Sequence, residues 1–152
     1  MRPLQFATTR PESYVLETPA SSPDDAARHF LAKLGVEADA SDVYTDMQRG
    51  VKGFVLIDAR SGDAFAVEHC KGAVSFHYRT MTAESTGSLP RDKIYVVYCS
   101  GTHCNASTKA AARLASFGFR VKEMIGGLEA WKKEGFPTES GAHVRPPVTQ
   151  RA

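Results

Sequence analysis

The sequence lacks any long run of apolar residues. No segment of the 152 residues is long and apolar enough to span a bilayer, and residues 1–6 lack the apolar core of a signal peptide. We therefore expect a cytoplasmic protein with no membrane partner.

An excess of charge of either sign is absent as well. The 19 basic and 17 acidic residues are interspersed, and the formal net charge is only +2. A protein that binds nucleic acid through its phosphates usually concentrates basic residues on one face. We expect no nucleic-acid partner, whereas the sequence leaves the oligomeric state unknown.

Cysteine is scarce, with Cys70, Cys99 and Cys104 as the three examples. An odd number in a chain of this size argues against a disulfide framework and favours reduced thiols. Together with His69 and His103 they could supply zinc ligands, but their spacing is not that of paired Cys-x-x-Cys motifs. We expect neither a metal nor another cofactor, and at least one thiol is free for chemistry.

Strand and helix patterns alternate along the chain. Hydrophobic residues make up 42% of the sequence, which is enough for the core of one domain. The patterns predict helices over residues 23–34, 41–50, 63–68, 109–117 and around 130–131, and strands over residues 54–57, 73–76, 94–98 and 121–125. This order predicts an α/β fold with a central, mostly parallel sheet covered by helices on both faces.

Composition divides the chain into three parts. Residues 1–22 are rich in Pro, Ser and Thr and are predicted to form an N-terminal arm, in which residues 14–16 are apolar enough to add an edge strand. Residues 23–137 form one domain, with an N-terminal helical part at 23–50 and a core at 51–137. Residues 138–152 are polar and contain proline, so we expect a flexible C-terminal tail.

The loop that follows the third predicted strand contains the most chemistry. Cys99 ends that strand, and the loop then comprises Ser100, Gly101, Thr102, His103, Cys104, Asn105 and Ala106. Backbone N–H groups between a strand and a helix converge on an anion, which lowers the pKa of a thiol there from about 8.5 to roughly 3.5–7.5. The thiolate attacks sulfur or phosphorus. His103 and Lys109 contribute if they point inward, and the alternative is that Cys99 is a small core residue.

Segments spread over residues 41–137 together resemble the rhodanese homology domain. Each segment is weakly specific by itself, but their order along the chain is specific. They are Leu56-Ile57-Asp58-Ala59-Arg60, Phe65, Glu68-His69-Cys70-Lys71-Gly72-Ala73, Val96-Val97-Tyr98-Cys99, Lys109-Ala110-Ala111, Gly118-Phe119, Met124-Ile125-Gly126-Gly127, Trp131 and Gly135-Phe136. The resemblance implies the three-layer rhodanese-like fold.

The resemblance also implies a sulfurtransferase. Cys99 would take up a sulfane sulfur as a persulfide from a small-molecule or protein-bound donor and pass it to a thiol or another nucleophilic acceptor. Asp58 and Arg60 match the family's Asp-x-Arg, and we expect them to support the strand end by charge-assisted hydrogen bonds rather than to take part in the reaction. We expect His69 to be a hydrogen-bonding residue of a turn.

The loop departs from the family pattern at one position. Simple rhodanese loops read Cys-x-x-Gly-x-Arg-Ser, but here Ala106 stands where the arginine would be, and the loop is longer. Because arginine offers a fixed fork for an anion, its loss leaves the donor open. It also disfavours the related phosphatases, since Asn105 replaces the arginine of Cys-x5-Arg after Cys99.

Two other functions remain alongside the sulfurtransferase. Cys104 could resolve a Cys99 persulfide or form a reversible disulfide with Cys99, which would make the protein a thiol redox sensor. Without the arginine, the domain could also be a binding or regulatory module that has no catalytic activity.

Overall fold

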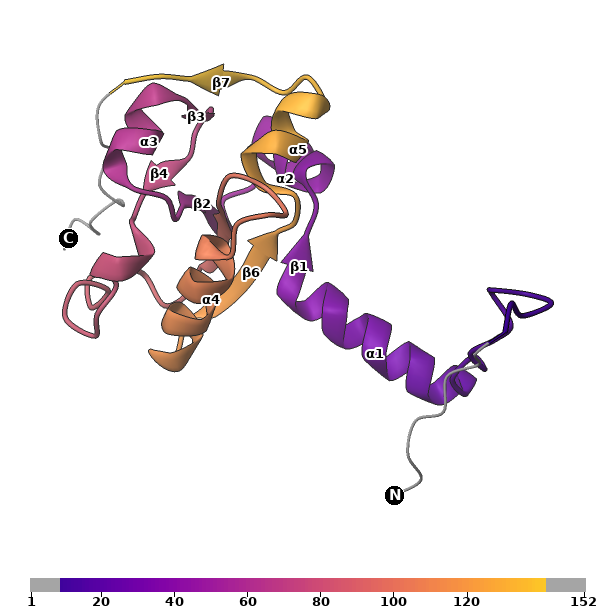
Figure 1. Cartoon of the computed structure of the whole chain (residues 1–152). Helices are drawn as coiled ribbons and strands as arrows, with labels where there is room; N and C mark the ends of the chain where they lie inside the picture. The colour runs from indigo at the N-terminus through magenta and orange to yellow at the C-terminus, as the bar shows by residue number, and fades with distance from the viewer. Residues whose placement is uncertain (1–8, 142–152) are drawn as a thin grey trace. The chain divides into compact units, whose positions relative to one another are not determined.

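The computed structural model describes residues 9–141 (Figure 1). The chain divides into two units, Met1–Lys33 and Leu34–Ala152. Helix α1, Pro23–Val36, begins after Ser22, whose hydroxyl accepts a hydrogen bond from the backbone N–H of Asp25 at 3.2 Å. The helix continues through Gly35, so the prediction that it stops there is wrong.

The expected edge strand at residues 14–16 is also wrong. These residues form a turn, and their side chains are exposed. The hydroxyl of Ser13 accepts a hydrogen bond from the backbone N–H of Leu16 at 3.2 Å, which closes that turn locally. Residues 1–8 of the predicted arm, which spans residues 1–22, lie outside the described residues.

The second unit contains a five-stranded, fully parallel sheet with the strand order β1-β6-β5-β2-β4. The strands are β1 Glu37–Ala38, β2 Phe54–Asp58, β4 Val74–Ser75, β5 Ile94–Tyr98 and β6 Arg120–Met124. A separate two-stranded ladder pairs β3 His69–Cys70 with β7 Thr138–Glu139 in antiparallel order. The predicted α/β fold with a mostly parallel sheet is therefore confirmed.

The central strands β2 and β5 are buried on both faces. Their register pairs Phe54 with Ile94 and Asp58 with Tyr98. Leu56 belongs to the core on one face of the sheet and Ile57 to the core on the other. Side chains of a strand alternate between faces, so only a continuous apolar run fills both cores.

Helices cover both faces, as Figure 1 shows for α4 on one side and for α2 and α5 on the other. The first face, which carries Leu56, is covered by α2 Ala40–Gln48, α3 Gly62–Val67 and α5 Gly127–Lys133. The second face, which carries Ile57, is covered by α4 Ala106–Ser116 and the short 3₁₀ helix η1 Tyr78–Thr80. Trp131 is fully buried in the first core, and its Nε1–H donates to the Pro137 carbonyl at 2.8 Å. Among residues 9–141, no helix is long and apolar enough to cross a membrane.

Several helix and strand boundaries differ from the predicted ones. Helix α2 spans Ala40–Gln48 rather than residues 41–50, and Asp39 is its N-cap, since the Asp39 carboxylate accepts from the Asp42 N–H at 2.7 Å. Helix α4 begins at Ala106 rather than at Lys109. The predicted tail is wrong at Thr138–Glu139, which forms β7, and its residues 142–152 lie outside the described part.

Candidate active site

Cys99 directly follows β5, at the carboxyl edge of the parallel sheet. Ligands of open α/β sheets bind at this edge, where the loops between strands and helices meet. The side chain of Cys99 is buried, with 2% of the residue exposed. The loop after it runs to Asn105, and α4 begins at Ala106.

Helix α5 holds the backbone of this loop from the other side. The N–H groups of Leu128 and Glu129 donate to the carbonyls of Cys99 and Ser100, both at 2.9 Å. Gly127 lies so close that a Cβ on it would come within 2.2 Å of the Cys99 carbonyl oxygen, and its φ is +57°. Only glycine fits both the left-handed backbone and this close approach.

The Cys99 thiol lies between a carbonyl and a hydroxyl. Its Sγ is 3.2 Å from the Cys104 carbonyl oxygen and 3.2 Å from the Ser107 Oγ. Ser107 in turn donates a hydrogen bond of 2.5 Å to a carboxylate oxygen of Glu123, which also accepts from the Thr108 hydroxyl at 2.7 Å. A thiol, a hydroxyl and a carboxylate thus form one continuous hydrogen-bonded chain.

Ser107, Thr108 and Glu123 were not among the site residues predicted from the sequence. Ser107 and Thr108 occupy the first turn of α4, which the sequence pattern started at Lys109. Glu123 is half-buried in β6 between Lys122 and Met124. A carboxylate in a strand of the central sheet is the one sequence signal for this residue, because a buried carboxylate needs a hydrogen-bonding partner.

The second thiol interacts with the first across the loop. Burial raises the pKa of the Cys104 thiol, but the N–H groups of Ala106 and Ser100 and the Cys99 thiol outweigh this, so that pKa lies below its usual value. Cys104 is half-buried, and neither cysteine is in a disulfide.

The thiol of Cys99 does not have the lowered pKa that the loop pattern predicts. Burial raises its pKa, and hydrogen bonds with Ser107 offset this only in part. The N–H groups of the loop are divided between two sulfur atoms, since Ala106 and Ser100 serve Cys104. Cys99 is therefore a thiol that needs help to lose its proton.

A cavity of about 220 Å³ opens onto this site. Cys99, Cys104, Ser107 and Glu123 line it, together with the residues of the turn between β6 and α5. Of the described residues that line the cavity, Glu123 is the only Asp, Glu, Lys, Arg or His. The cavity is thus wide enough for a small sulfur compound and carries no cation for an anionic one.

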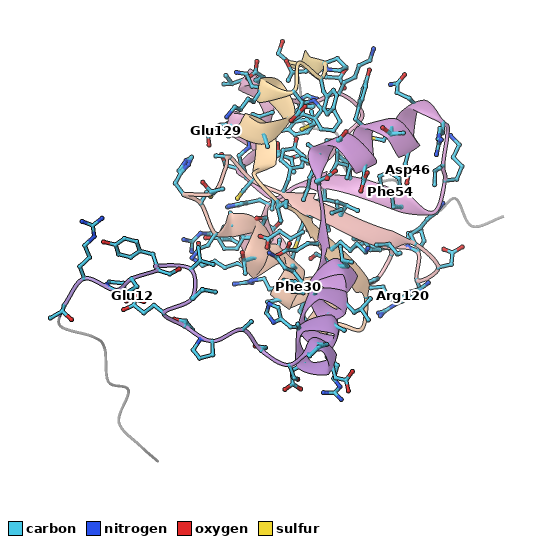
Figure 2. All side chains as sticks on the ribbon, turned by 90° about the vertical axis from the view of Figure 1, so that its right-hand side faces the viewer. Glu12, Phe30, Asp46, Phe54, Arg120 and Glu129 are labelled. Carbon is cyan, nitrogen blue, oxygen red and sulfur yellow. The ribbon has the colours of Figure 1, made fainter. Side chains whose placement is uncertain are left out.

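The remaining predicted loop residues lie at the rim. Gly101 is buried next to the Glu129 side chain, and Thr102 lines the cavity with an exposed side chain. His103 Nδ1 lies 3.7 Å from a carboxylate oxygen of Glu129, and both side chains are about two-thirds exposed. Figure 2 shows Glu129 at the surface on α5. Asn105 precedes α4 without a side-chain capping bond.

Asp58 and Arg60 form a two-point ion pair. Arg60 Nε donates to one carboxylate oxygen at 3.0 Å and Nη2 to the other at 2.7 Å. Nη2 also donates to the Glu68 carbonyl at 2.6 Å, and Asp58 is fully buried. The pair ties the end of β2 to the segment after α3, which is the geometry of structural support.

Two further predicted residues lie outside the cavity. The Nζ of Lys109 lies 5.5 Å from the centre of the Tyr78 ring. His69 is buried, stacks on Phe65 and places Nδ1 2.7 Å from the Phe65 carbonyl oxygen. Neither residue reaches the Cys99 thiol through an interaction of the described residues.

The third cysteine is not a candidate nucleophile. Cys70 is fully buried, and burial raises the pKa of its thiol to about 12. Within residues 9–141, no three His, Cys, Asp or Glu side chains gather closely enough to hold a metal ion.

A larger cavity of about 430 Å³ lies elsewhere, between α2 and the sheet. Its lining includes Asp46 and Phe54, both labelled in Figure 2. It contains no cysteine or histidine, so the smaller cavity at Cys99 is the candidate active site.

Comparison with known proteins identifies the class. The family model described as Rhodanese-like domain matches residues 39–134, and the chain belongs to that family. The resemblance drawn from the sequence is thereby confirmed. A solved structure, the BH2092 protein from Bacillus halodurans, superposes with a TM-score of 0.76 at 35% identity over 86% of this chain and 95% of its own.

Two curated relatives carry different names. Thiosulfate sulfurtransferase GlpE from Actinobacillus succinogenes is 35% identical over 95 residues, which are 60% of this chain and 81% of that protein. The HTH-type transcriptional regulator Rv0324 from Mycobacterium tuberculosis is 29% identical over 112 residues, which are 73% of this chain. The chain spans about half, 49%, of the regulator's length.

Proposed function

We propose that the protein is a sulfurtransferase that carries a sulfane sulfur as a persulfide on Cys99. The observation that supports this most is the position of the Cys99 thiol, at the end of β5 and at the wall of a small cavity. Membership of the rhodanese-like domain family and a relative named thiosulfate sulfurtransferase point the same way.

The reaction has two displacements at sulfur. The Cys99 thiolate attacks the outer sulfur of the donor, a new S–S bond forms, and the donor's leaving group departs with the electron pair of the broken bond. An acceptor thiolate then attacks the outer sulfur of the persulfide, and Cys99 leaves as a thiolate. Donor and acceptor are small molecules or protein-bound thiols, and the reaction takes place in the cytoplasm.

The charge of the residues that line the cavity indicates which donors suit this site. Thiosulfate carries two negative charges, and the described lining offers no arginine or lysine to bind them. A persulfide of a small thiol has no such requirement. We expect a persulfide donor to load Cys99 faster than thiosulfate does.

Intact-mass measurement tests this proposal. The purified protein is incubated with thiosulfate or with a small-molecule persulfide, alongside Cys99→Ser, Cys104→Ser and Cys70→Ser. We expect an adduct of about 32 Da that disappears only in Cys99→Ser. The absence of an adduct with either donor contradicts the enzyme and favours a non-catalytic binding module of the kind that a relative named as a regulator suggests.

A thiol redox switch is the second candidate, because the thiols of Cys99 and Cys104 interact directly. Hydrogen peroxide would take two electrons and two protons from the pair, so a disulfide forms and peroxide becomes water. The expected sign is a mass loss of about 2 Da that requires both cysteines. A gain of about 16 Da on Cys99 alone, a stable sulfenic acid, contradicts the switch.

A further inference from the structure

We propose that Glu123 takes the proton of the Cys99 thiol through the hydroxyl of Ser107, and so prepares the nucleophile. This inference rests on the proposed function, in which Cys99 attacks the donor. Glu123 acts through Ser107, and is thus a positioning residue of the site.

The direction of each hydrogen bond follows from the number of protons available. Ser107 has a single hydroxyl hydrogen, and a carboxylate can only accept, so the 2.5 Å bond runs from Ser107 to Glu123. The lone pairs of the Ser107 oxygen are then left for Cys99, whose Sγ lies 3.2 Å away. In the contact with Ser107 the Cys99 thiol can therefore only donate, and its single proton is shared with the Cys104 carbonyl, which also lies 3.2 Å from Sγ.

The proton transfer that this chain supports is balanced. The thiol proton passes from Sγ to the Ser107 oxygen while the Ser107 hydroxyl proton passes to the Glu123 carboxylate. No group other than these three changes its bonds to hydrogen. The products are a Cys99 thiolate and a neutral carboxylic acid, so one negative charge has moved from Glu123 to the sulfur.

A base is useful here because the described residues that line the cavity at Cys99 include no cation, and the charge of Arg60 lowers the pKa of the Cys104 thiol rather than that of Cys99. Burial raises the pKa of the Cys99 thiol. His103 is exposed and paired with Glu129, while Lys109 lies over the Tyr78 ring. The family's arginine is replaced by Ala106, whose side chain has no charge. Proton removal by Glu123 then replaces charge stabilisation of the thiolate.

The surroundings of Glu123 fix the oxygen that receives the proton. The Thr108 hydroxyl donates, at 2.7 Å, to the same Glu123 carboxylate oxygen that accepts from Ser107. The other titratable groups nearby are Cys104, which shares the cavity, and Glu37, at the paired position on β1. Two carbonyl oxygens compete with Ser107 for the proton of the Cys99 thiol, that of Cys104 at 3.2 Å and that of Gly101 at 4.0 Å.

The rate at which Cys99 reacts with iodoacetamide tests the relay without any sulfur donor. The measurement uses a Cys104→Ser background, so that Cys99 is the accessible thiol, and runs from about pH 5 to pH 10. Glu123→Gln keeps a side-chain oxygen that accepts from Ser107 but cannot take a proton. We expect the alkylation rate of Cys99 in Glu123→Gln to fall about 10- to 100-fold at neutral pH. The rate of this variant should then vary with pH only as the thiolate fraction of Cys99 does.

A simple electrostatic role for Glu123 predicts the opposite sign. Removing a negative charge next to a thiol favours the thiolate, so Glu123→Gln would then raise the rate at neutral pH. A raised or unchanged rate overturns the relay. Ser107→Ala is expected to lower the rate as Glu123→Gln does, and Ser107→Thr, which retains the hydroxyl, to restore it.

Glu84→Gln is the matched control, because it makes the same change in an exposed carboxylate that does not line the cavity at Cys99. We expect its rate profile to match that of the parent. A fall as large as that of Glu123→Gln refutes the relay. Since alkylation needs no sulfur donor, a working relay in a protein that never forms a persulfide would show that the relay stands and the sulfurtransferase proposal fails.

Discussion

Replacing Gly127 by alanine should displace the backbone of the loop at Cys99. An L-residue in the left-handed region, here φ +57°, costs about 1–2 kcal/mol. The new methyl group would lie 2.2 Å from the Cys99 carbonyl oxygen, and relieving such overpacking costs roughly 1–3 kcal/mol more. We therefore expect a total loss of about 2–5 kcal/mol in the free energy of unfolding.

Gly135 supplies the control, because its φ is +78° and nothing lies within 4 Å of a Cβ built there. Gly135→Ala should lose only the backbone part, about 1–2 kcal/mol. Urea unfolding of both variants gives the difference, provided that the slope of each transition is the same. Equal losses would refute the close-approach argument.

The same two variants separate stability from function. Gly127→Ala has to push the Cys99 carbonyl away, and a shift of the nucleophile by about 1 Å can reduce a rate about 100-fold. Gly135→Ala should leave the rate of persulfide formation unchanged, as measured by intact mass. A Gly127→Ala protein that forms the persulfide at the parent rate would show that the loop tolerates displacement.

Two further predictions concern buried groups. Arg60→Ala leaves the fully buried Asp58 carboxylate without its partner and should lower the free energy of unfolding by about 3–5 kcal/mol, while Arg60→Lys recovers only part; urea midpoints that match the parent would contradict this. Burial raises the pKa of Cys70 to about 12, so the unfolded chain releases this proton at a lower pH than the folded chain does. The contribution of this thiol to the free energy of unfolding is therefore complete below the ordinary thiol pKa of about 8.5 and is lost as the pH rises towards 12. Urea midpoints across this range should fall less steeply in Cys70→Ala, and an identical slope would rule out the thiol as a cause.

Much of the fold could be predicted from local sequence patterns. The runs at residues 54–57 and 94–98 are apolar without interruption because β2 and β5 are covered on both faces, and such a pattern survives in the sequence. The loop was found because Cys99 follows one of these runs directly. Element ends were less predictable, since the Asp39 cap depends on backbone geometry that the sequence only suggests.

The chemistry of the site was harder to predict because it depends on contacts between distant segments. Glu123 lies 16 positions after Ser107 and meets it only when β6 packs beside α4. The raised pKa of Cys99 likewise follows from burial, whereas the strand-to-helix pattern alone suggests a lowered one. The local pattern therefore predicted where the Cys99 thiol lies but not the direction in which its pKa is shifted.

The short ladder between β3 and β7 determines where the chain can be shortened. The family match ends at residue 134, yet Pro137 accepts hydrogen bonds from Trp131 Nε1 and from the Lys71 N–H, and the Gly141 N–H donates to Ala66. A protein cut after residue 134 would keep the segment that the family model matches, but it would lose Gly135-Phe136, the acceptor of the buried Trp131 Nε1–H and the strand that pairs with β3. Deletion variants, proteolytic fragments and fusion junctions should therefore be placed beyond Gly141.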